Sequence, residues 1–153
     1  MKIIDHPRMR GEVDIVVFNP DGSVKESRKI HNLVVNVGLA HIVSRMVGTA
    51  QAVMSHMGLG AGTTAAAAGD TALGSPLGSR VALTSTTISG TNNEQVIYVA
   101  SFGPGVGTGA VTEAGTFNAL TSGTMLCRTV FSVVNKAAGD TMQVTWTITL
   151  SAT

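Results

Sequence analysis

Residues 142–150 read Met-Gln-Val-Thr-Trp-Thr-Ile-Thr-Leu, and apolar and polar side chains alternate along this stretch without interruption. Because successive side chains of a β-strand point to opposite faces of the sheet, the alternation predicts a strand with one buried and one exposed face. Its polar face carries threonine and glutamine, with no charged residue. We therefore expect Trp146 and its apolar neighbours to lie in the core of a β-rich domain.

The segments before this strand predict further strands. Residues 125–134 are rich in apolar and β-branched side chains, and the connection 135–140 contains the Gly and Asp that tight turns favour. We therefore expect 125–134 and 142–150 to form an antiparallel hairpin. Further strands are expected at 79–89, 95–102 and 111–117, the last two separated by a glycine-rich segment.

The N-terminal third predicts a second hairpin and a helix. The turn Asn19-Pro20-Asp21-Gly22 separates two strand-like segments, because Pro presets φ and Gly accepts the left-handed conformation. Apolar side chains then recur at helical spacing, with Asn36 available as a cap and Gly48 as a stop. The elements expected here are strands at 13–18 and 24–30, a helix at about 37–47, and a short strand at 53–59.

Together these elements predict a mainly β fold, an antiparallel β-sandwich or jelly-roll-like domain with one short helix. We expect a single β-rich domain over residues 13–153 and an N-terminal arm over residues 1–12. The arm contains Lys2, Asp5, Arg8 and Arg10, which we expect to contact a neighbouring subunit of an assembly, and Pro7 disfavours a helix there. The alternative is that this segment forms an edge strand of its own domain.

Charged side chains are scarce. Of 153 residues, 19 are charged, and only seven of the 105 residues after Gly48 are: Arg80, Arg128, Lys136, Asp70, Glu94, Glu113 and Asp140. A free monomer usually keeps about a quarter of its residues charged, which keeps it soluble. Such a deficit indicates either a membrane protein or a protein whose surface is covered by other subunits.

The membrane interpretation is not supported by the sequence. No stretch reaches the roughly 18 to 20 continuous apolar residues that a spanning helix needs, and the N-terminus lacks the apolar segment of a signal peptide. The net charge of +1 also disfavours a nucleic-acid binder, which would carry a basic stripe. We therefore expect no membrane and no nucleic-acid partner, and a surface covered by other protein subunits.

Candidate chemical motifs are weak. Gly58-x-Gly60-x-Gly62 partly mimics a dinucleotide-binding motif, but its spacing is wrong and a flexible loop is the better interpretation. Histidines 6, 31, 41 and 56 show no metal-ligand spacing. Cys127 is expected to be a small buried residue. We therefore expect no catalytic residue, no cofactor and no metal.

Glu113 is a lone acid in a strand of small and apolar residues. A carboxylate in such a place is more often paired structurally than catalytic, because an unpaired buried charge is costly. Arg80 and Arg128 are the two candidate partners. We expect a structural ion pair here.

The order of these segments resembles small structural proteins of tailed bacteriophages. The resemblance covers about residues 11–151 and includes Asn-Leu-Val-Val-Asn-Val-Gly-Leu (32–39), His-Met-Gly-Leu-Gly-Ala-Gly-Thr-Thr-Ala (56–65) and Gly-Thr-Met-Leu-Cys-Arg-Thr-Val-Phe (123–131). It also includes Thr-Glu-Ala-Gly-Thr-Phe-Asn-Ala (112–119). At Thr116, similar proteins often have an apolar residue, so we expect this strand end to be exposed.

The resemblance implies a virion protein without enzymatic activity. Proteins of this appearance occur as capsid decoration (cement) proteins and also near tail-fibre genes. The first class implies binding to the major capsid protein on the outer capsid surface, as a homotrimer, after assembly in the host cytoplasm. The alternative is a tail-fibre, adaptor or other tail-associated module. Size favours decoration, because 153 residues ending on the last strand leave little room for a fibre shaft.

Overall fold

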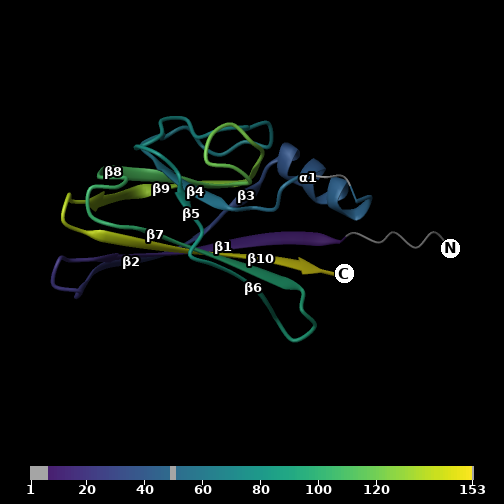
Figure 1. Ribbon diagram of the computed structural model, residues 1–153, viewed down its shortest axis with the longest axis horizontal. Helices are drawn as coiled ribbons and strands as arrows, with labels where there is room; N and C mark the ends of the chain where they lie inside the picture. Colours follow the sequence, from purple (N-terminus) through teal and green to yellow (C-terminus); the bar gives the residue numbers. More distant parts are fainter. Residues whose placement is uncertain (1–6, 49–50, 153) are drawn as a thin grey trace.

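Four of the five apolar side chains of residues 142–150 lie in the interior, as the alternation predicts, whereas Leu150 near the end of the strand is 46% exposed. Trp146, Val144 and Met142 are fully buried, and their threonine neighbours face outward. The computed structural model describes residues 7–48 and 51–152. Two antiparallel sheets face one another, with one helix at the end of the sandwich (Figure 1). The predicted mainly β class is confirmed, with 51% of the described residues in strands and 8% in helix.

Each sheet has five strands. The first sheet has the order β2 (Val24–His31), β1 (Arg8–Phe18), β10 (Thr141–Ser151), β7 (Gln95–Phe102), β6 (Ser85–Ser89). The second sheet has the order β3 (Leu33–Val34), β9 (Met125–Lys136), β8 (Gly109–Phe117), β4 (His56–Gly60), β5 (Val81–Ala82). The helix α1 (Asn36–Met46) follows β3 directly.

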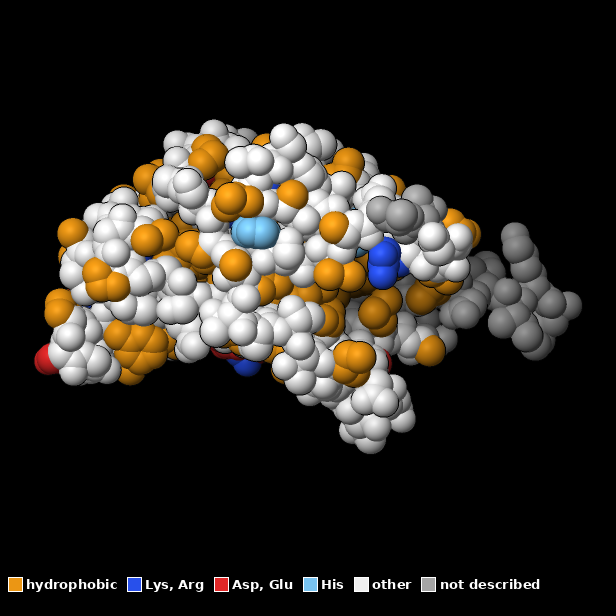
Figure 2. All heavy atoms as spheres, viewed as in Figure 1, with side chains coloured by type: hydrophobic (Ala, Val, Ile, Leu, Met, Phe, Trp, Pro, Cys, Tyr) orange, Lys and Arg blue, Asp and Glu red, His pale blue; other side chains and the backbone are white. Residues whose placement is uncertain are grey.

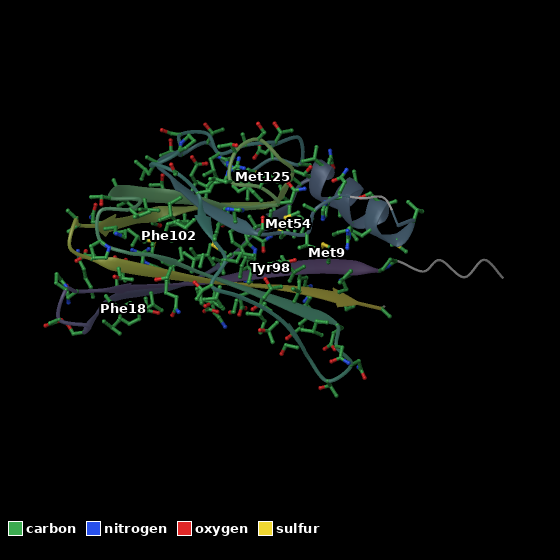
Figure 3. The ribbon with its side chains drawn as sticks, in the orientation of Figure 1. Met9, Phe18, Met54, Tyr98, Phe102 and Met125 are labelled. Carbon is green, nitrogen blue, oxygen red and sulfur yellow. The ribbon has the colours of Figure 1, made fainter. Side chains whose placement is uncertain are left out.

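The core lies between the inner faces of the two sheets. Trp146 and Phe102 are its largest residues from the first sheet, and Met57 and Leu59 from the second are almost fully buried. Figure 3 shows Phe102 between the two sheets. Tyr98 of the first sheet and Met54 belong to the same core cluster, and both are labelled in this view. The burial of these apolar side chains supplies the main driving force for folding.

The expected hairpin between 125–134 and 142–150 is wrong. β9 pairs with β8 and β3 in the second sheet, whereas β10 pairs with β1 and β7 in the first. The tight turn at 137–140 does exist, with the Asp140 N–H donating to Ala137 O. It carries the chain from one sheet to the other, because turn residues specify a reversal but not the sheet that the next strand joins.

A buried lysine accompanies this crossover. The side chain of Lys136, at the end of β9, is almost fully buried, and its Nζ donates to Gly103 O at 2.9 Å and to Asp140 O at 2.7 Å. Desolvation lowers the pKa of Lys136, and the nearby Asp140 carboxylate partly opposes that effect. Lys25 also forms an ion pair with Asp140 at 2.6 Å. These contacts join the two sheets at one end of the sandwich.

Other expected strands are found with changed bounds. The segment 79–89 is split between the sheets, because β5 belongs to the second and β6 to the first. The strand expected at 53–59 begins later, at His56. Thr116, expected at an exposed strand end, is fully buried instead, because β8 lies between β9 and β4.

The helix is found where its periodicity predicts, but its cap differs. Val35 is the N-cap, no side chain caps the helix, and Asn36 is the first helical residue. Gly48 follows the helix with φ of 72° and donates its N–H to Arg45 O, as expected for a C-terminal glycine. Much of the apolar stripe faces outward, and Met46 is 81% exposed.

The N-terminal segment belongs in part to the domain. Arg8 and Arg10 lie on β1 and pair with Ser151 and Thr149 of β10. Residues 8–12 are therefore part of the first sheet and not of a separate arm, because β10 offers them a full set of backbone partners. Lys2 and Asp5 lie outside the described residues.

Candidate functional site

Glu113 is the centre of the most elaborate polar cluster in the described structure. Its carboxylate lies on β8, is fully buried, and accepts backbone N–H groups from three residues of the segment 61–80, here called the strap. The donors are Gly62 at 3.0 Å, Gly74 at 3.0 Å and Ser75 at 2.7 Å. A carboxylate this well supplied with donors remains charged in the interior.

Arg128 supplies the compensating charge from the neighbouring strand β9. Its Nη2 lies 2.7 Å from Glu113 Oε2, and its Nη1 lies 2.7 Å from Asp70 Oδ2 in the strap. Nη2 also donates to Thr64 O at 3.2 Å. The expected pairing of Glu113 is confirmed with Arg128, while Arg80 forms different contacts. The sequence does not reveal the role of Asp70, because nothing in it indicates which loop residue reaches a strand far away.

The pKa shifts in this cluster follow from its hydrogen bonds. Burial raises the pKa of Glu113, but the N–H groups of Ser75 and Gly74, the Arg128 guanidinium and the Gly62 N–H together lower it below its usual value. The backbone N–H of Ala67, followed by Arg128, lowers the pKa of Asp70. Both carboxylates are therefore anionic near neutral pH and neither is poised as a proton donor.

Two glycines of the motif 58–62 lie directly against this cluster. Gly58 and Gly60 lie in β4, so the expected flexible loop is wrong for these two residues. A Cβ on Gly62 would lie 2.6 Å from Glu113 Cδ, and a Cβ on Gly60 would lie 2.7 Å from Ser75 O. Glycine is needed because the strap and the Glu113 side chain approach the backbone closely. The motif therefore has a structural reason.

Beside the strap is a half-open cavity of about 430 Å³. Arg80 forms one wall, with its guanidinium carbon 3.4 Å from the centroid of the Phe117 ring. Its Nη1 donates to Ala119 O at 2.9 Å and to Ser122 O at 2.6 Å. These bonds hold the loop after β8, and the remaining wall is mostly apolar, including Leu73.

Within 7–48 and 51–152, no three His, Cys, Asp or Glu side chains are grouped so that they could hold a metal ion. His41 is buried, with Nδ1 3.1 Å from Gln51 Oε1, and His56 Nδ1 lies 2.8 Å from Ser55 Oγ. Cys127 is buried as expected, and burial raises the pKa of its thiol.

No helix in the described part of the chain could cross a bilayer.

The surface formed by residues 51–152 is even poorer in charge than the sequence of that region. Four of the seven charged residues after Gly48 are almost fully buried: Glu113, Arg128, Lys136 and Asp140. Asp70 is paired with Arg128, which leaves Arg80 and Glu94, both only partly exposed. Figure 2 shows one face on which uncharged side chains and backbone predominate.

Most of the remaining charges of the described residues lie on the β1–β2 hairpin. Arg8 and Arg10 are exposed there, and neither forms an ion pair with another described residue. Arg10 borders a shallow hollow of about 340 Å³ on the outer face of the first sheet, next to Glu12, His31 and Thr147. The two arginines are thus together and accessible at the start of β1.

Comparison with known proteins identifies no relative. No protein-family model, curated protein sequence or solved structure matches this chain.

Proposed function

We propose that this chain is a non-enzymatic structural protein of a tailed-phage virion, a decoration protein that binds the outside of the head shell and stabilises it. The proposal joins the resemblance of residues 11–151 to phage structural proteins with the physical character of the folded surface. Its partners are the major capsid protein and further copies of this chain, with the threefold arrangement expected from the resemblance.

The observation that carries the proposal is the neutral surface of residues 51–152. The fold places most of the few charges of this region inside, where they hold the strap and join the sheets. Solubility as a free monomer favours the opposite arrangement, with charges outside. A protein covered by neighbouring subunits gains from a neutral surface, because charged groups are costly to desolvate at the centre of an interface.

The buried cluster gives such a protein rigidity. Without regular strands, the strap would lose its conformation easily. Glu113 binds it at Gly62 and Ser75, and Arg128 binds it at Asp70. A rigid module loses little conformational entropy on binding, and many weak contacts repeated over a shell add up to firm attachment. The cluster therefore suits a binding module better than a catalyst.

We assign contact with the coat protein to Arg8 and Arg10. Both are exposed on the first sheet beside the hollow at Glu12 and His31. Arginine is favoured at protein interfaces because its planar guanidinium can bind two acceptors at once. Of the four residues expected to contact the capsid, these are the two that the structure describes.

Copy number tests the function. Quantitative mass spectrometry of purified virions should find this chain at a level comparable to that of the major coat protein, because decoration proteins cover the shell. A few copies per particle would instead favour a tail-associated module. Absence from purified particles would contradict both virion assignments.

A further inference from the structure

Three of the four sheet edges are protected against pairing with another chain. β2, at one edge of the first sheet, carries Lys25, Glu26, Arg28 and Lys29. The edge strands of the second sheet, β3 and β5, have only two residues each. Charged side chains and very short strands are the usual means by which natural sheets prevent edge-to-edge association.

The fourth edge, β6, lacks this protection. It reads Ser-Thr-Thr-Ile-Ser (85–89), has no charge, no proline and no glycine, and pairs with β7 over all five residues. Residues 85–88 are exposed, and Ile88 is 69% exposed. The β6–β7 hairpin extends beyond the body of the sandwich, so its outer edge is sterically accessible (Figure 1).

The side chains of β6 also remain without cover on the inner face. Ile88 pairs with Val96 of β7, which in turn pairs with the buried Ile148 of β10, so the three side chains share one face of the sheet. The second sheet covers Ile148 but not Ile88. A strand added beside β6 would satisfy its backbone groups and cover part of this isoleucine.

We propose that β6 pairs antiparallel with β6 of a second copy of this chain across a twofold axis at Thr87, which joins the first sheets of two molecules into one ten-stranded sheet. The inference rests on the proposed function for the need to self-associate, and it names the strand that does so. In a threefold assembly, this twofold contact links neighbouring trimers, since a twofold contact cannot close a trimer.

Self-complementarity selects a second copy as the occupant. Centred on Thr87, antiparallel pairing sets Thr86 opposite Ile88 of the other copy and Ser85 opposite its Ser89. No charge opposes another charge, and threonine beside isoleucine is a favourable cross-strand neighbour. A twofold contact uses the same edge on both molecules, so pairing ends at two and does not grow into a fibre.

A cysteine placed at the axis tests the pairing. In Thr87→Cys, the two new thiols would lie on directly opposed residues, close enough for a disulfide. The native Cys127 is buried and does not interfere. Ser27→Cys, exposed on the charged edge strand β2, is the matched control. On mild oxidation, most of the purified Thr87→Cys protein should migrate as a covalent dimer, and the control should remain mostly monomeric.

A lysine at the same two positions gives a second readout. Thr87→Lys places like charges face to face across the axis and should weaken self-association about tenfold or more in sedimentation, whereas Ser27→Lys should leave it unchanged. Both positions are exposed, so the fold tolerates either change. If Thr87→Cys cross-links no more than Ser27→Cys, and Thr87→Lys sediments like the wild type, the inference is overturned.

Shell binding is measured separately with the same variants. Cross-linking at Thr87 by a protein that does not bind phage shells would leave the β6 contact standing and refute the proposed function. Shell binding by a protein that never pairs through β6 would refute the contact alone.

Discussion

Arg128 and Glu113 face each other on neighbouring strands of the second sheet, with Nη2 2.7 Å from Oε2 and both side chains almost fully buried. From this pair, hydrogen bonds reach Gly62, Gly74 and Ser75 in the strap. A segment without regular strands is thereby fixed to the sheet by charge-assisted bonds, which are the stronger class of hydrogen bond. The conformation of the strap therefore depends on this buried pair.

Glu113→Gln should strongly destabilise the protein. Glutamine presents N–H groups to donors and leaves Arg128 with Asp70 as its remaining counter-charge. Breaking a buried pair in this way costs about 3 to 5 kcal/mol. Chemical denaturation measures the free energy of unfolding. Glu26→Gln, which breaks the surface pair with Arg28, is the control and should cost less than about 1 kcal/mol. Equal effects of the two variants would contradict the role of the cluster.

Stability should fall in acid. The pKa values of Asp70, Glu113 and Asp140 are lowered in the folded state, the last chiefly by its hydrogen bond with Lys25. The unfolded chain therefore binds protons first as the pH falls. The stabilisation from these carboxylates is complete above the ordinary pKa values of 3.8 for Asp and 4.5 for Glu. It is lost as the pH falls through the lower pKa values that these groups have in the folded protein.

Denaturation curves at several pH values check this dependence. The free energy of unfolding should change little between about pH 7 and pH 6 and fall clearly by about pH 3. Asp70→Asn should flatten the decline, because one of the three groups no longer titrates. A free energy of unfolding that stays constant down to about pH 3 would contradict the assignment of these carboxylates.

Gly62→Ala should dislodge the strap. The new methyl group would lie 2.6 Å from Glu113 Cδ, closer than real Cβ contacts allow, so the carboxylate or the strap must move. Overpacking of this kind costs about 1 to 3 kcal/mol. Gly69→Ala is the matched control, because a Cβ there meets no atom within 4 Å. Thermal melting of the two variants should differ by several degrees, and identical melting would show that Gly62 is not constrained.

Trp146→Ala should cost about 3 to 5 kcal/mol through lost burial and a residual cavity. The ring is fully buried on β10, with no hydrogen-bond partner for Nε1 within the described structure. Val133→Ala, at a half-exposed position of β9, is the control and should change stability by less than about 1 kcal/mol. A soluble Trp146→Ala protein with unchanged melting would mean that the ring lies outside the core.

The sequence predicts the strands better than their partners. Alternation over 142–150 predicts β10 and its buried face, because period two reflects the local geometry of a strand. Pairing depends on the whole chain, and the turn at 137–140 looks the same whether it closes a hairpin or crosses between sheets. Both partners of the Glu113 to Arg128 pair could be named as candidates, since a lone charge in a neutral strand needs compensation. Asp70 could not, because it reaches the cluster from an irregular loop.

Replacing both Arg8 and Arg10 by alanine should weaken attachment to phage shells about tenfold or more while leaving the protein folded, because both side chains are exposed. Cosedimentation of the protein with shells lacking it measures the affinity. The pair Arg28→Ala and Lys29→Ala removes the same charge from β2 and should have a smaller effect. Equal losses in the two double variants would indicate a general electrostatic attraction and contradict a specific contact at the start of β1.

Electron cryomicroscopy of the complete phage particle tests the central claim most directly. The account predicts repeated density on the outer surface of the head shell into which this two-sheet sandwich fits, with neighbouring copies in contact. A particle whose head shell carries no such density, or whose only matching density lies on the tail, would contradict it.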